Sequence, residues 1–152
     1  MRSMRRLSLK GCVLVFSVLV LHPAGIHSQE EPGQSESVAA PSSRLAVLWT
    51  SGDREVALKV AFMYTGAASR QGWFDEVLLI VWGPSARLLA EDPALQARVA
   101  AMQDEGVEVV ACRACADGYG VTTVLEGLGI EVKFMGQPLT EMLKGDWEIL
   151  TF

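Results

Sequence analysis

Two cysteines separated by two residues are the strongest chemical feature of this sequence. Cys112 directly follows a β-rich apolar run, and Cys115 lies three positions later, where a helix is expected to begin. The positive end of that helix and the adjacent Arg113 favour a thiolate, which is the nucleophilic form of cysteine. The spacing lets the second sulfur reach the first. We therefore expect Cys115 to resolve a mixed disulfide or persulfide on Cys112, or to close a disulfide with it.

The same pair of cysteines also fits less reactive interpretations. Free cysteine is among the most buried residue types, so both side chains could simply fill the core. An exported chain could instead hold them as a static structural disulfide. The spacing by itself does not separate sulfur transfer from dithiol–disulfide redox chemistry. All of these alternatives stay open at this point.

The first 28 residues have the pattern of a secretory signal peptide. A basic start is followed by a mostly apolar run at residues 11–21, and Pro23 closes the run. A membrane span needs ~20 apolar residues, so we expect no stable span after cleavage. Cleavage after Ser28 predicts an exported chain, either periplasmic or secreted. Residues 29–43 are rich in Ser, Glu, Gln and Pro, which predicts a flexible linker, and residues 44–152 are the expected folded domain.

Removing the predicted signal peptide changes which chemistry the composition permits. His22, His27 and Cys12 all lie within it, and its four basic residues leave 9 basic against 18 acidic residues, a net charge of −9. Without histidine, a Ser-His-Asp or Cys-His catalytic arrangement is excluded within one chain. Two cysteines supply only half of a four-cysteine zinc site, so we expect no metal and no cofactor. The acidic balance argues against nucleic acid as a partner.

Five short β-rich runs alternate with helical stretches along residues 44–152. This order predicts a three-layer α/β/α sandwich around a five-stranded, mainly parallel sheet. The expected strands are residues 45–49, 77–82, 107–111, 130–134 and 147–152, and the expected helices are residues 54–71, 92–105 and 137–144. Four glycines each fall just past a helical run, where a helix-ending glycine is expected, namely Gly72, Gly106, Gly129 and Gly145.

Two of the helices have apolar residues at helical spacing. In residues 92–105, Asp92-Pro93 is a suitable start, and an inward face of Leu95, Val99 and Met102 is expected. The helix at residues 54–71 carries apolar side chains on one face and more beside it, which indicates a buried helix or a subunit contact. The first face consists of Val56, Val60, Met63, Tyr64 and Ala67, and the flanking residues are Leu58 and Phe62.

The loops that follow the strands carry small and turn-forming residues. In a parallel sheet these loops share one edge, where ligands bind in a crevice. Their residues could do no more than form turns and cap helices. Alternatively, they line a small pocket whose backbone N–H groups suit an anion or a thiolate. The residues predicted to line such a pocket are Ser51, Gly52, Asp53, Gly83, Ser85, Arg113, Tyr119 and Gly136.

Three stretches of the sequence resemble the DsrE family (DsrE/DsrF-like small sulfur-relay proteins). They are LAVLWTSGDREVALKVAFMYTGAASRQGWFDEVLLIVWGPSARLLAED, VEVVACRACADGYGV and LEGLGIEVKFMGQPLTEMLKGDWEILTF. The resemblance spans residues 44–152, and its most specific part runs from Cys112 to Gly120. It implies a three-layer α/β sandwich, homo- or hetero-oligomers, and sulfane sulfur carried as a persulfide on the cysteine that matches Cys112. The implied partners are a sulfur donor or acceptor, either a protein or a small thiol, and further copies of the chain.

The expected function is therefore that of an exported sulfur carrier of the sulfurtransferase type. In this hypothesis Cys112 accepts the sulfur and Cys115 is the resolving thiol. One alternative is a non-enzymatic ligand-binding or assembly module that holds the two cysteines as a structural pair. The other is a dithiol–disulfide oxidoreductase, for which both cysteines would form the redox couple.

Overall fold

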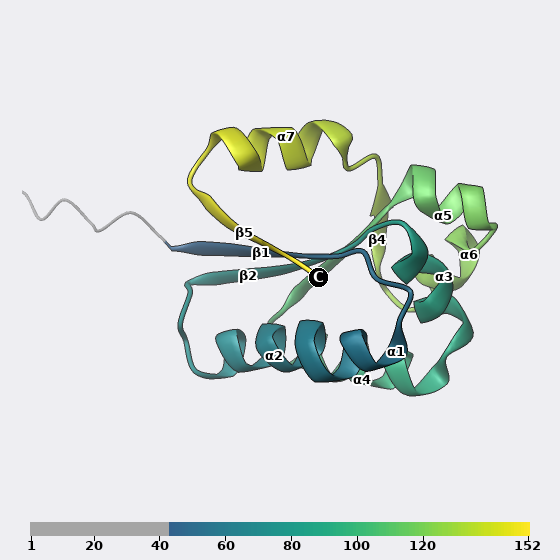
Figure 1. Ribbon diagram of the computed structural model, residues 1–152, viewed down its shortest axis with the longest axis horizontal. Coiled ribbons are helices and arrows are strands. Elements are labelled where there is room, and N and C mark those ends of the chain that lie inside the picture. The colour runs from purple at the N-terminus through teal and green to yellow at the C-terminus, as the bar shows by residue number, and fades with distance from the viewer. Residues whose placement is uncertain (1–42) are drawn as a thin grey trace, which may run out of the picture. The chain divides into compact units, whose positions relative to one another are not determined.

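The computed structural model describes residues 43–152, and within them five strands alternate with helices (Figure 1). The strands are β1 (Arg44–Trp49), β2 (Glu76–Val81), β3 (Glu108–Cys112), β4 (Glu131–Lys133) and β5 (Trp147–Thr151). In this part of the chain no helix is long and apolar enough to cross a membrane. The predicted signal peptide and all but the last residue of the predicted linker lie outside the described residues.

The strands form one sheet in the order β4-β3-β2-β1-β5, and every neighbouring pair is parallel. The central strands are apolar on both faces because helices cover both faces of the sheet (Figure 1). Side chains alternate between these faces, so that Val47 points to one of them and Ala46 to the other. The predicted α/β fold with a five-stranded parallel sheet is confirmed.

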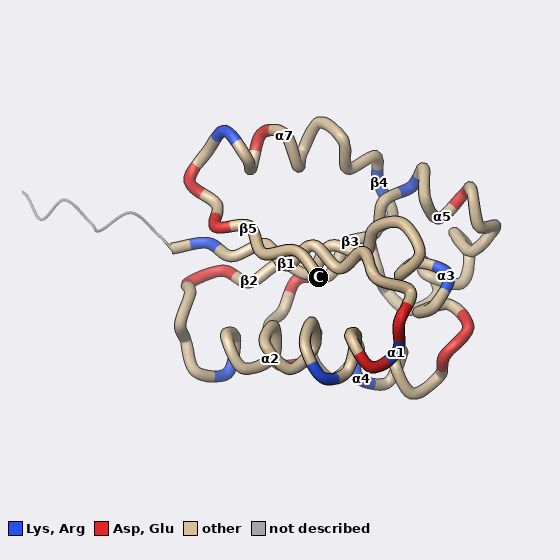
Figure 2. The backbone as a smooth tube through the Cα atoms, in the orientation of Figure 1, with Lys and Arg blue, Asp and Glu red and all other residues tan. Residues whose placement is uncertain are grey.

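The helices divide unequally between the two faces (Figure 1). The elements α1 (Arg54–Val56), the π-helical segment η1 (Ala57–Ala61) and α2 (Phe62–Arg70) follow one another without a break and form one continuous helical rod. This rod and α4 (Pro93–Asp104) cover one face of the sheet. The other face is covered by α7 (Gly136–Lys144). The short helices α3 (Pro84–Glu91), α5 (Arg113–Tyr119) and α6 (Thr122–Gly127) contact one another near the carboxyl ends of the strands. Charged residues lie mainly on the helices and loops (Figure 2).

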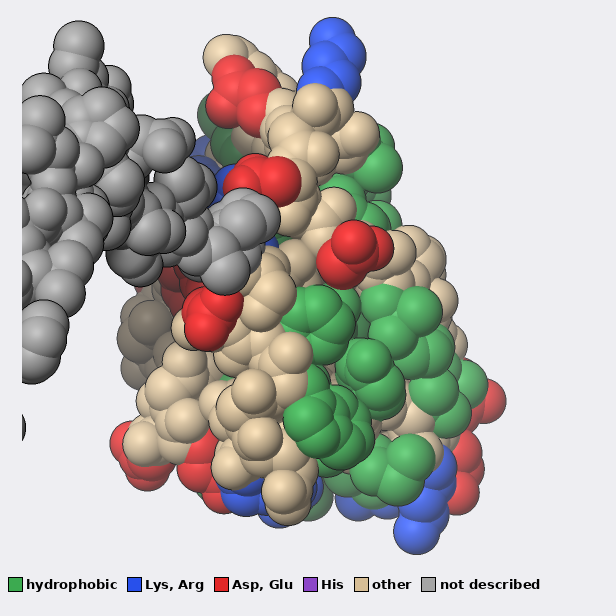
Figure 3. Space-filling model, turned by 90° about the vertical axis from the view of Figure 1, so that its left-hand side faces the viewer, with side chains coloured by type: hydrophobic (Ala, Val, Ile, Leu, Met, Phe, Trp, Pro, Cys, Tyr) green, Lys and Arg blue, Asp and Glu red, His purple; other side chains and the backbone are tan. Residues whose placement is uncertain are grey.

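The rod formed by α1, η1 and α2 packs on the sheet with a face that the sequence does not single out. Ala57, Ala61 and Ala68 are fully buried, whereas Val60 and Met63 are 37% and 59% exposed. Small side chains let the rod approach a sheet surface that large side chains already fill, so the face at Val56, Val60, Met63, Tyr64 and Ala67 is not the buried one. Part of the outer face belongs to the hydrophobic patch visible in Figure 3.

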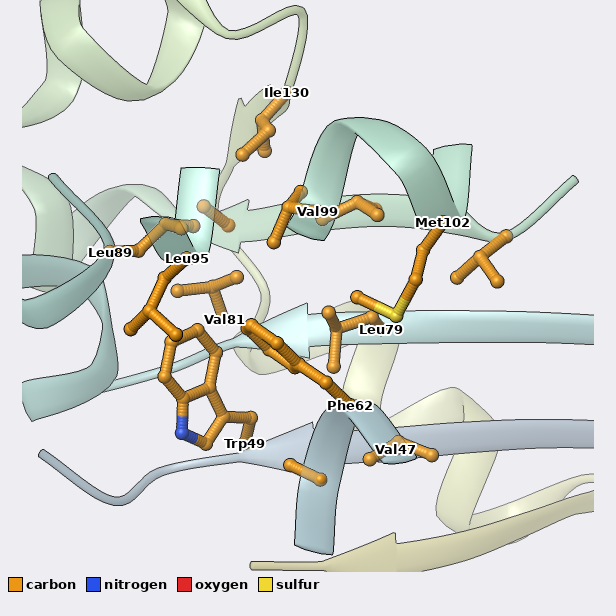
Figure 4. Close-up of a cluster of buried hydrophobic side chains, with 14 of the residues drawn as sticks. Val47, Trp49, Phe62, Leu79, Val81, Leu89, Leu95, Val99, Met102 and Ile130 are labelled. Atoms are coloured by element: carbon orange, nitrogen blue, oxygen red, sulfur yellow. The ribbon is translucent and has the colours of Figure 1, made fainter. Parts of the chain in front are cut away.

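The main core lies between the sheet and the rod (Figure 4). Trp49 and Phe62 meet edge to face, with ring centroids 4.8 Å apart and an interplanar angle of 77°. The predicted inward face of α4 is confirmed, because Leu95, Val99 and Met102 are buried. The predicted start of α4 is also confirmed, since the Asp92 carboxylate accepts hydrogen bonds from two backbone N–H groups of the first turn.

The glycines predicted to end the helices behave in two ways. Gly72, Gly106 and Gly129 have positive φ angles, as expected just after a helical run. Gly145 also directly follows its helix, as predicted, but its φ is −98°, so it does not adopt the left-handed conformation of the other three. A Cβ atom at Gly145 would lie 3.1 Å from the carbonyl oxygen of Glu141. Gly145 therefore serves close packing against the end of α7.

Candidate functional site

Cys112 lies at the junction between β3 and α5. It is the last residue of β3 and occupies the N-cap position of α5, although its side chain makes no capping hydrogen bond. Alternation along β3 turns Ala111 toward the rod and Cys112 toward α7. The residue is 3% exposed. Its sulfur therefore lies at the edge of a second, smaller hydrophobic cluster between the sheet and α7, near the start of that helix.

Cys115 follows in the first turn of α5 and lies against Cys112. Both cysteines are free thiols. Burial raises the pKa of Cys115, while the N–H of Gly83 donates to its sulfur and partly opposes this effect. The Cys115 S–H also donates to Cys112, and a negative charge on Cys112 raises the pKa of Cys115 further. The raised pKa favours the protonated thiol of Cys115, and Cys112 is the candidate nucleophile because it lines the pocket described below.

A pocket of about 510 Å³ opens over Cys112 on the α7 side of the sheet. Its walls are mostly apolar and come from the ends of β2 and β4 and from the start of α7. A hydrogen bond of 2.9 Å from the Gln137 amide to the Glu141 carboxylate crosses its polar side. The other lining residues are Trp82, Ala114, Phe134, Met135, Gly136 and Pro138. Such a pocket suits a small sulfur compound or the end of a side chain that reaches Cys112.

Lys133 is a cationic residue beside Cys112 that the sequence analysis missed. The two residues are register partners on β3 and β4, so their side chains emerge on the same face of the sheet. Neighbouring strands lie ~4.8 Å apart, so Lys133 is the residue adjacent to Cys112 on β4, although it does not line the pocket. In the structure its ammonium group pairs with Glu131 at 2.5 Å. Within residues 43–152 no group of three or more side chains could hold a metal ion.

Two residues predicted to line the pocket lie away from it. The guanidinium of Arg113 donates to the Val132 carbonyl at 2.8 Å and to the Glu126 carboxylate at 3.1 Å. Tyr119 is 40% exposed at the end of α5, where the guanidinium of Arg87 lies 5.4 Å from its ring centroid. Neither residue is among those that line the pocket over the cysteine.

The predicted residues of the first two loops hold the ends of β1 and β2 together. Asp53 caps α1, and its backbone N–H donates to Ser51. The buried Ser85 hydroxyl donates to the Trp49 carbonyl at 2.6 Å. Gly52 packs so closely on α3 that a Cβ atom would lie 3.1 Å from a Pro84 carbon. These four residues act in turns and caps and do not line the pocket.

Two of the predicted glycines do lie at the site. Gly83 supplies the N–H that reaches the Cys115 sulfur, and its φ of +69° explains the choice of glycine at this turn. Gly136 begins α7 and lines the pocket over Cys112. The structure therefore brings Gly83, Gly136 and the two cysteines together at one end of the sheet.

Comparison with known proteins places this arrangement in a family. The model of the DsrE/DsrF-like family matches residues 43–152. A solved structure of a conserved protein of unknown function from Bacteroides thetaiotaomicron is similar, with 34% identity, a TM-score of 0.70, and coverage of 72% of this chain and 95% of that one. The ychN protein of E. coli shares the fold at 18% identity and a TM-score of 0.57, over 72% of this chain and 99% of its own. No curated protein matches the sequence.

The family model covers the whole described domain, including every strand of the sheet and both cysteines. The structural similarity to the Bacteroides protein extends over nearly all of that protein's length. This chain therefore belongs to the DsrE/DsrF-like family.

Proposed function

We propose that this protein is a sulfur carrier that accepts sulfane sulfur as a persulfide on Cys112, with Cys115 as the resolving thiol. The observation that carries the proposal is a buried cysteine at the base of a pocket of about 510 Å³, with a second thiol hydrogen-bonded to it. Membership of the DsrE/DsrF-like family supports a sulfur-relay role.

The loading step needs only thiol exchange chemistry. The Cys112 thiolate attacks the outer sulfur of a donor persulfide, R–S–SH. The donor S–S bond breaks, a new S–S bond forms on Cys112, and the electron pair leaves with R–S⁻, which takes up a proton from solvent. An acceptor thiolate then removes the outer sulfur by the same reaction and regenerates the Cys112 thiolate. No net oxidation or reduction occurs in this cycle.

Cys115 opens a second exit for the bound sulfur. Its thiolate can attack the inner sulfur of the Cys112 persulfide, which forms the Cys112–Cys115 disulfide and releases the outer sulfur as hydrosulfide. The two cysteines are oxidised in this step, and the carried sulfur is reduced. Because the raised pKa keeps Cys115 protonated, this exit is slow at neutral pH. Resolution then requires a reductant, such as a small thiol, before the next cycle.

The decisive experiment is mass spectrometry of the reduced protein after treatment with a polysulfide donor. We expect a gain of one sulfur atom that cyanide or a thiol reductant removes. Cys112→Ser is expected to abolish the adduct, while Cys115→Ser is expected to retain it. An unmodified wild-type protein, or an adduct that persists in Cys112→Ser, would contradict the proposal.

The hydrogen bond between the two thiols also supports a second candidate function, that of a dithiol–disulfide oxidoreductase. This function predicts turnover of a model disulfide that disappears in both single-cysteine variants. If Cys115→Ser retains sulfur loading while disulfide turnover is absent from the wild type, the carrier function is favoured. If neither cysteine reacts with a thiol reagent in the native reduced protein, a structural pair in a binding or assembly module is favoured instead.

We also propose that the chain is exported. The support is the pattern of residues 1–28, with its basic start, its apolar run and the small residue Ser28 at the expected cleavage position. The N-terminal sequence of the protein recovered from cells tests this proposal. A start near residue 29 is expected, and a retained N-terminus would contradict it.

A further inference from the structure

The pocket over Cys112 is lined by one charged side chain, the carboxylate of Glu141. The other residues around the cysteine are apolar, glycine or the neutral Gln137, and no lysine or arginine of the described domain lines the pocket. Its volume of about 510 Å³ lies in the range of pockets that take small organic molecules. The lining therefore indicates which class of sulfur donor the pocket admits.

The Glu141 carboxylate is oriented by a neighbour one turn earlier on α7. The Gln137 amide donates to it at 2.9 Å, and the i, i+4 spacing places both side chains on the same side of the helix. Glu141 is exposed, so its charge is open to a ligand that enters from solvent. Among residues 43–152 no lysine or arginine forms an ion pair with it. Its negative charge is therefore available to a bound donor.

Two cations that lie close to Cys112 in the sheet or along the chain have acidic partners elsewhere. Lys133 pairs with Glu131 at 2.5 Å. Arg113 pairs with Glu126 at 3.1 Å. Neither cation lines the pocket, so neither neutralises the carboxylate at its rim by direct contact. We therefore expect a negative electrostatic potential in the pocket.

The walls of the pocket suit the carbon atoms of an organic donor. Trp82 and Phe134 supply aromatic surface, and Phe134 is 67% exposed, so a ligand can cover it. Met135 and Pro138 add further apolar surface. An organic group gains by removing such surface from water. An inorganic anion such as thiosulfate or polysulfide would lose part of its hydration there without a cation to replace it.

We propose that the sulfur donor of this site is an aminothiol persulfide, a small organic persulfide with an ammonium group near its sulfur. The inference rests on the proposed persulfide chemistry of Cys112 and names the donor that the pocket selects. The carbon chain of the donor packs on the apolar walls, and its ammonium pairs with Glu141. The Cys112 thiolate attacks the outer sulfur, the donor S–S bond breaks, and the aminothiol leaves as a thiolate that takes up a proton from solvent.

Glu141 discriminates between donors by Coulomb attraction and repulsion. Unit charges ~5 Å apart at the surface of a protein change a rate by about tenfold, and salt weakens this effect. The carboxylate therefore speeds the approach of a cationic donor and slows that of an anionic one, while a neutral donor is unaffected. An anionic polysulfide in excess still loads Cys112, but more slowly than a cationic persulfide of the same intrinsic reactivity.

The first test measures the charge preference of the pocket without any persulfide. Two methanethiosulfonate reagents of similar size, one with an ammonium and one with a sulfonate group, react with the reduced Cys115→Ser protein, and the adduct on the Cys112 peptide is followed by mass. Each rate is divided by that of a free thiol. The ratio of cationic to anionic rates should fall about tenfold when Glu141→Gln is added. Glu148→Gln on β5 removes the same charge away from the pocket and should leave the ratio unchanged. An equal ratio with and without Glu141→Gln would overturn the proposal.

The second test loads sulfur from the persulfides of aminoethanethiol, mercaptoethanol and mercaptopropionate, which are cationic, neutral and anionic. With each rate again divided by that of a free thiol, the wild type should load fastest from the cationic donor. Glu141→Gln should narrow the spread about tenfold with the neutral rate unchanged, and Glu141→Lys should reverse the order. Loading that is insensitive to both substitutions overturns this inference and leaves the proposed function standing. Loading from none of the donors overturns the proposed function and this inference with it.

Discussion

The raised pKa of Cys115 makes the lifetime of a persulfide on Cys112 depend on pH. Cys115 can attack the persulfide and release hydrosulfide only when it is in the thiolate form. Burial raises the pKa of this thiol, against the opposing hydrogen bond from the N–H of Gly83. The ordinary pKa of a cysteine is ~8.5, so the raised value lies above the neutral range. At neutral pH Cys115 is therefore almost entirely protonated.

The magnitude follows from the fraction of thiolate. Below the pKa, that fraction rises about tenfold for each pH unit, so the rate of hydrosulfide release should rise about tenfold per unit between pH ~6 and ~8. Cys115→Ser removes the resolving group. Its persulfide should persist with little dependence on pH, while the sulfur is loaded as in the wild type.

The assay loads the reduced protein with sulfur, removes the donor, and follows the mass adduct and the released sulfide over time at several pH values. Cys112→Ser serves as the unloaded control for background sulfide. The reasoning is refuted if the wild-type lifetime does not change with pH, or if Cys115→Ser loses sulfur with the same pH dependence. The first result would show that Cys115 does not resolve the persulfide, and the second would assign the loss to solvent or to free thiols.

Three further substitutions test the surroundings of the site. Lys133→Gln should slow loading from an anionic polysulfide several-fold, because it removes the cation on the strand beside the nucleophile. The initial rate of mass gain measures this effect. Lys144→Gln, at the far end of α7, is the control and should leave the rate unchanged. Gly83→Ala should lower the free energy of unfolding by about 1–2 kcal/mol in denaturant titrations, because its φ is +69°; an unchanged stability would contradict this. Ser85→Ala should destabilise the fold by about 0.5–1.5 kcal/mol and leave sulfur loading unchanged, because the Trp49 carbonyl loses the hydroxyl donor but keeps the N–H of Trp82 at 3.0 Å.

The sheet was predictable from the sequence because its signals are local. Runs such as residues 45–49 are apolar throughout, as strands covered on both faces must be, and the intervening helices require parallel strands. The packing of the first helix was not predictable in the same way. Val60 and Met63 are as apolar as the buried Ala57 and Ala61, so the sequence offers two apolar faces. Only contact with the filled sheet surface decides that the face with small side chains is the inner one.

The reactive residues of the site could be predicted from the sequence, but the residues that line its pocket could not. Cys112 and Cys115 are identified by residue type and spacing, and a shared sheet edge follows from parallel strands. Which loop residues enter the pocket depends on the side of the sheet to which Cys112 points. It shares the α7 side with Trp82, and Phe134 and Glu141 are among the residues that line the pocket on that side. The alternation of apolar residues along β3 shows that Cys112 and Ala111 point to opposite faces of the sheet. It does not show which of the two faces α7 covers.

The absence of histidine from residues 43–152 also bears on which reactions this site can perform. Hydrolysis of an amide or ester by cysteine needs a general acid that protonates a poor leaving group, usually a histidine. Thiol exchange makes no such demand, because the leaving group is a thiolate that departs without prior protonation. The site therefore needs one nucleophilic sulfur, a pocket that admits the donor, and a neighbour that stays protonated until the sulfur has moved on. Cys112, the pocket beneath α7 and Cys115 meet these three requirements, and for this reason sulfur transfer is the reaction that the arrangement favours over hydrolysis.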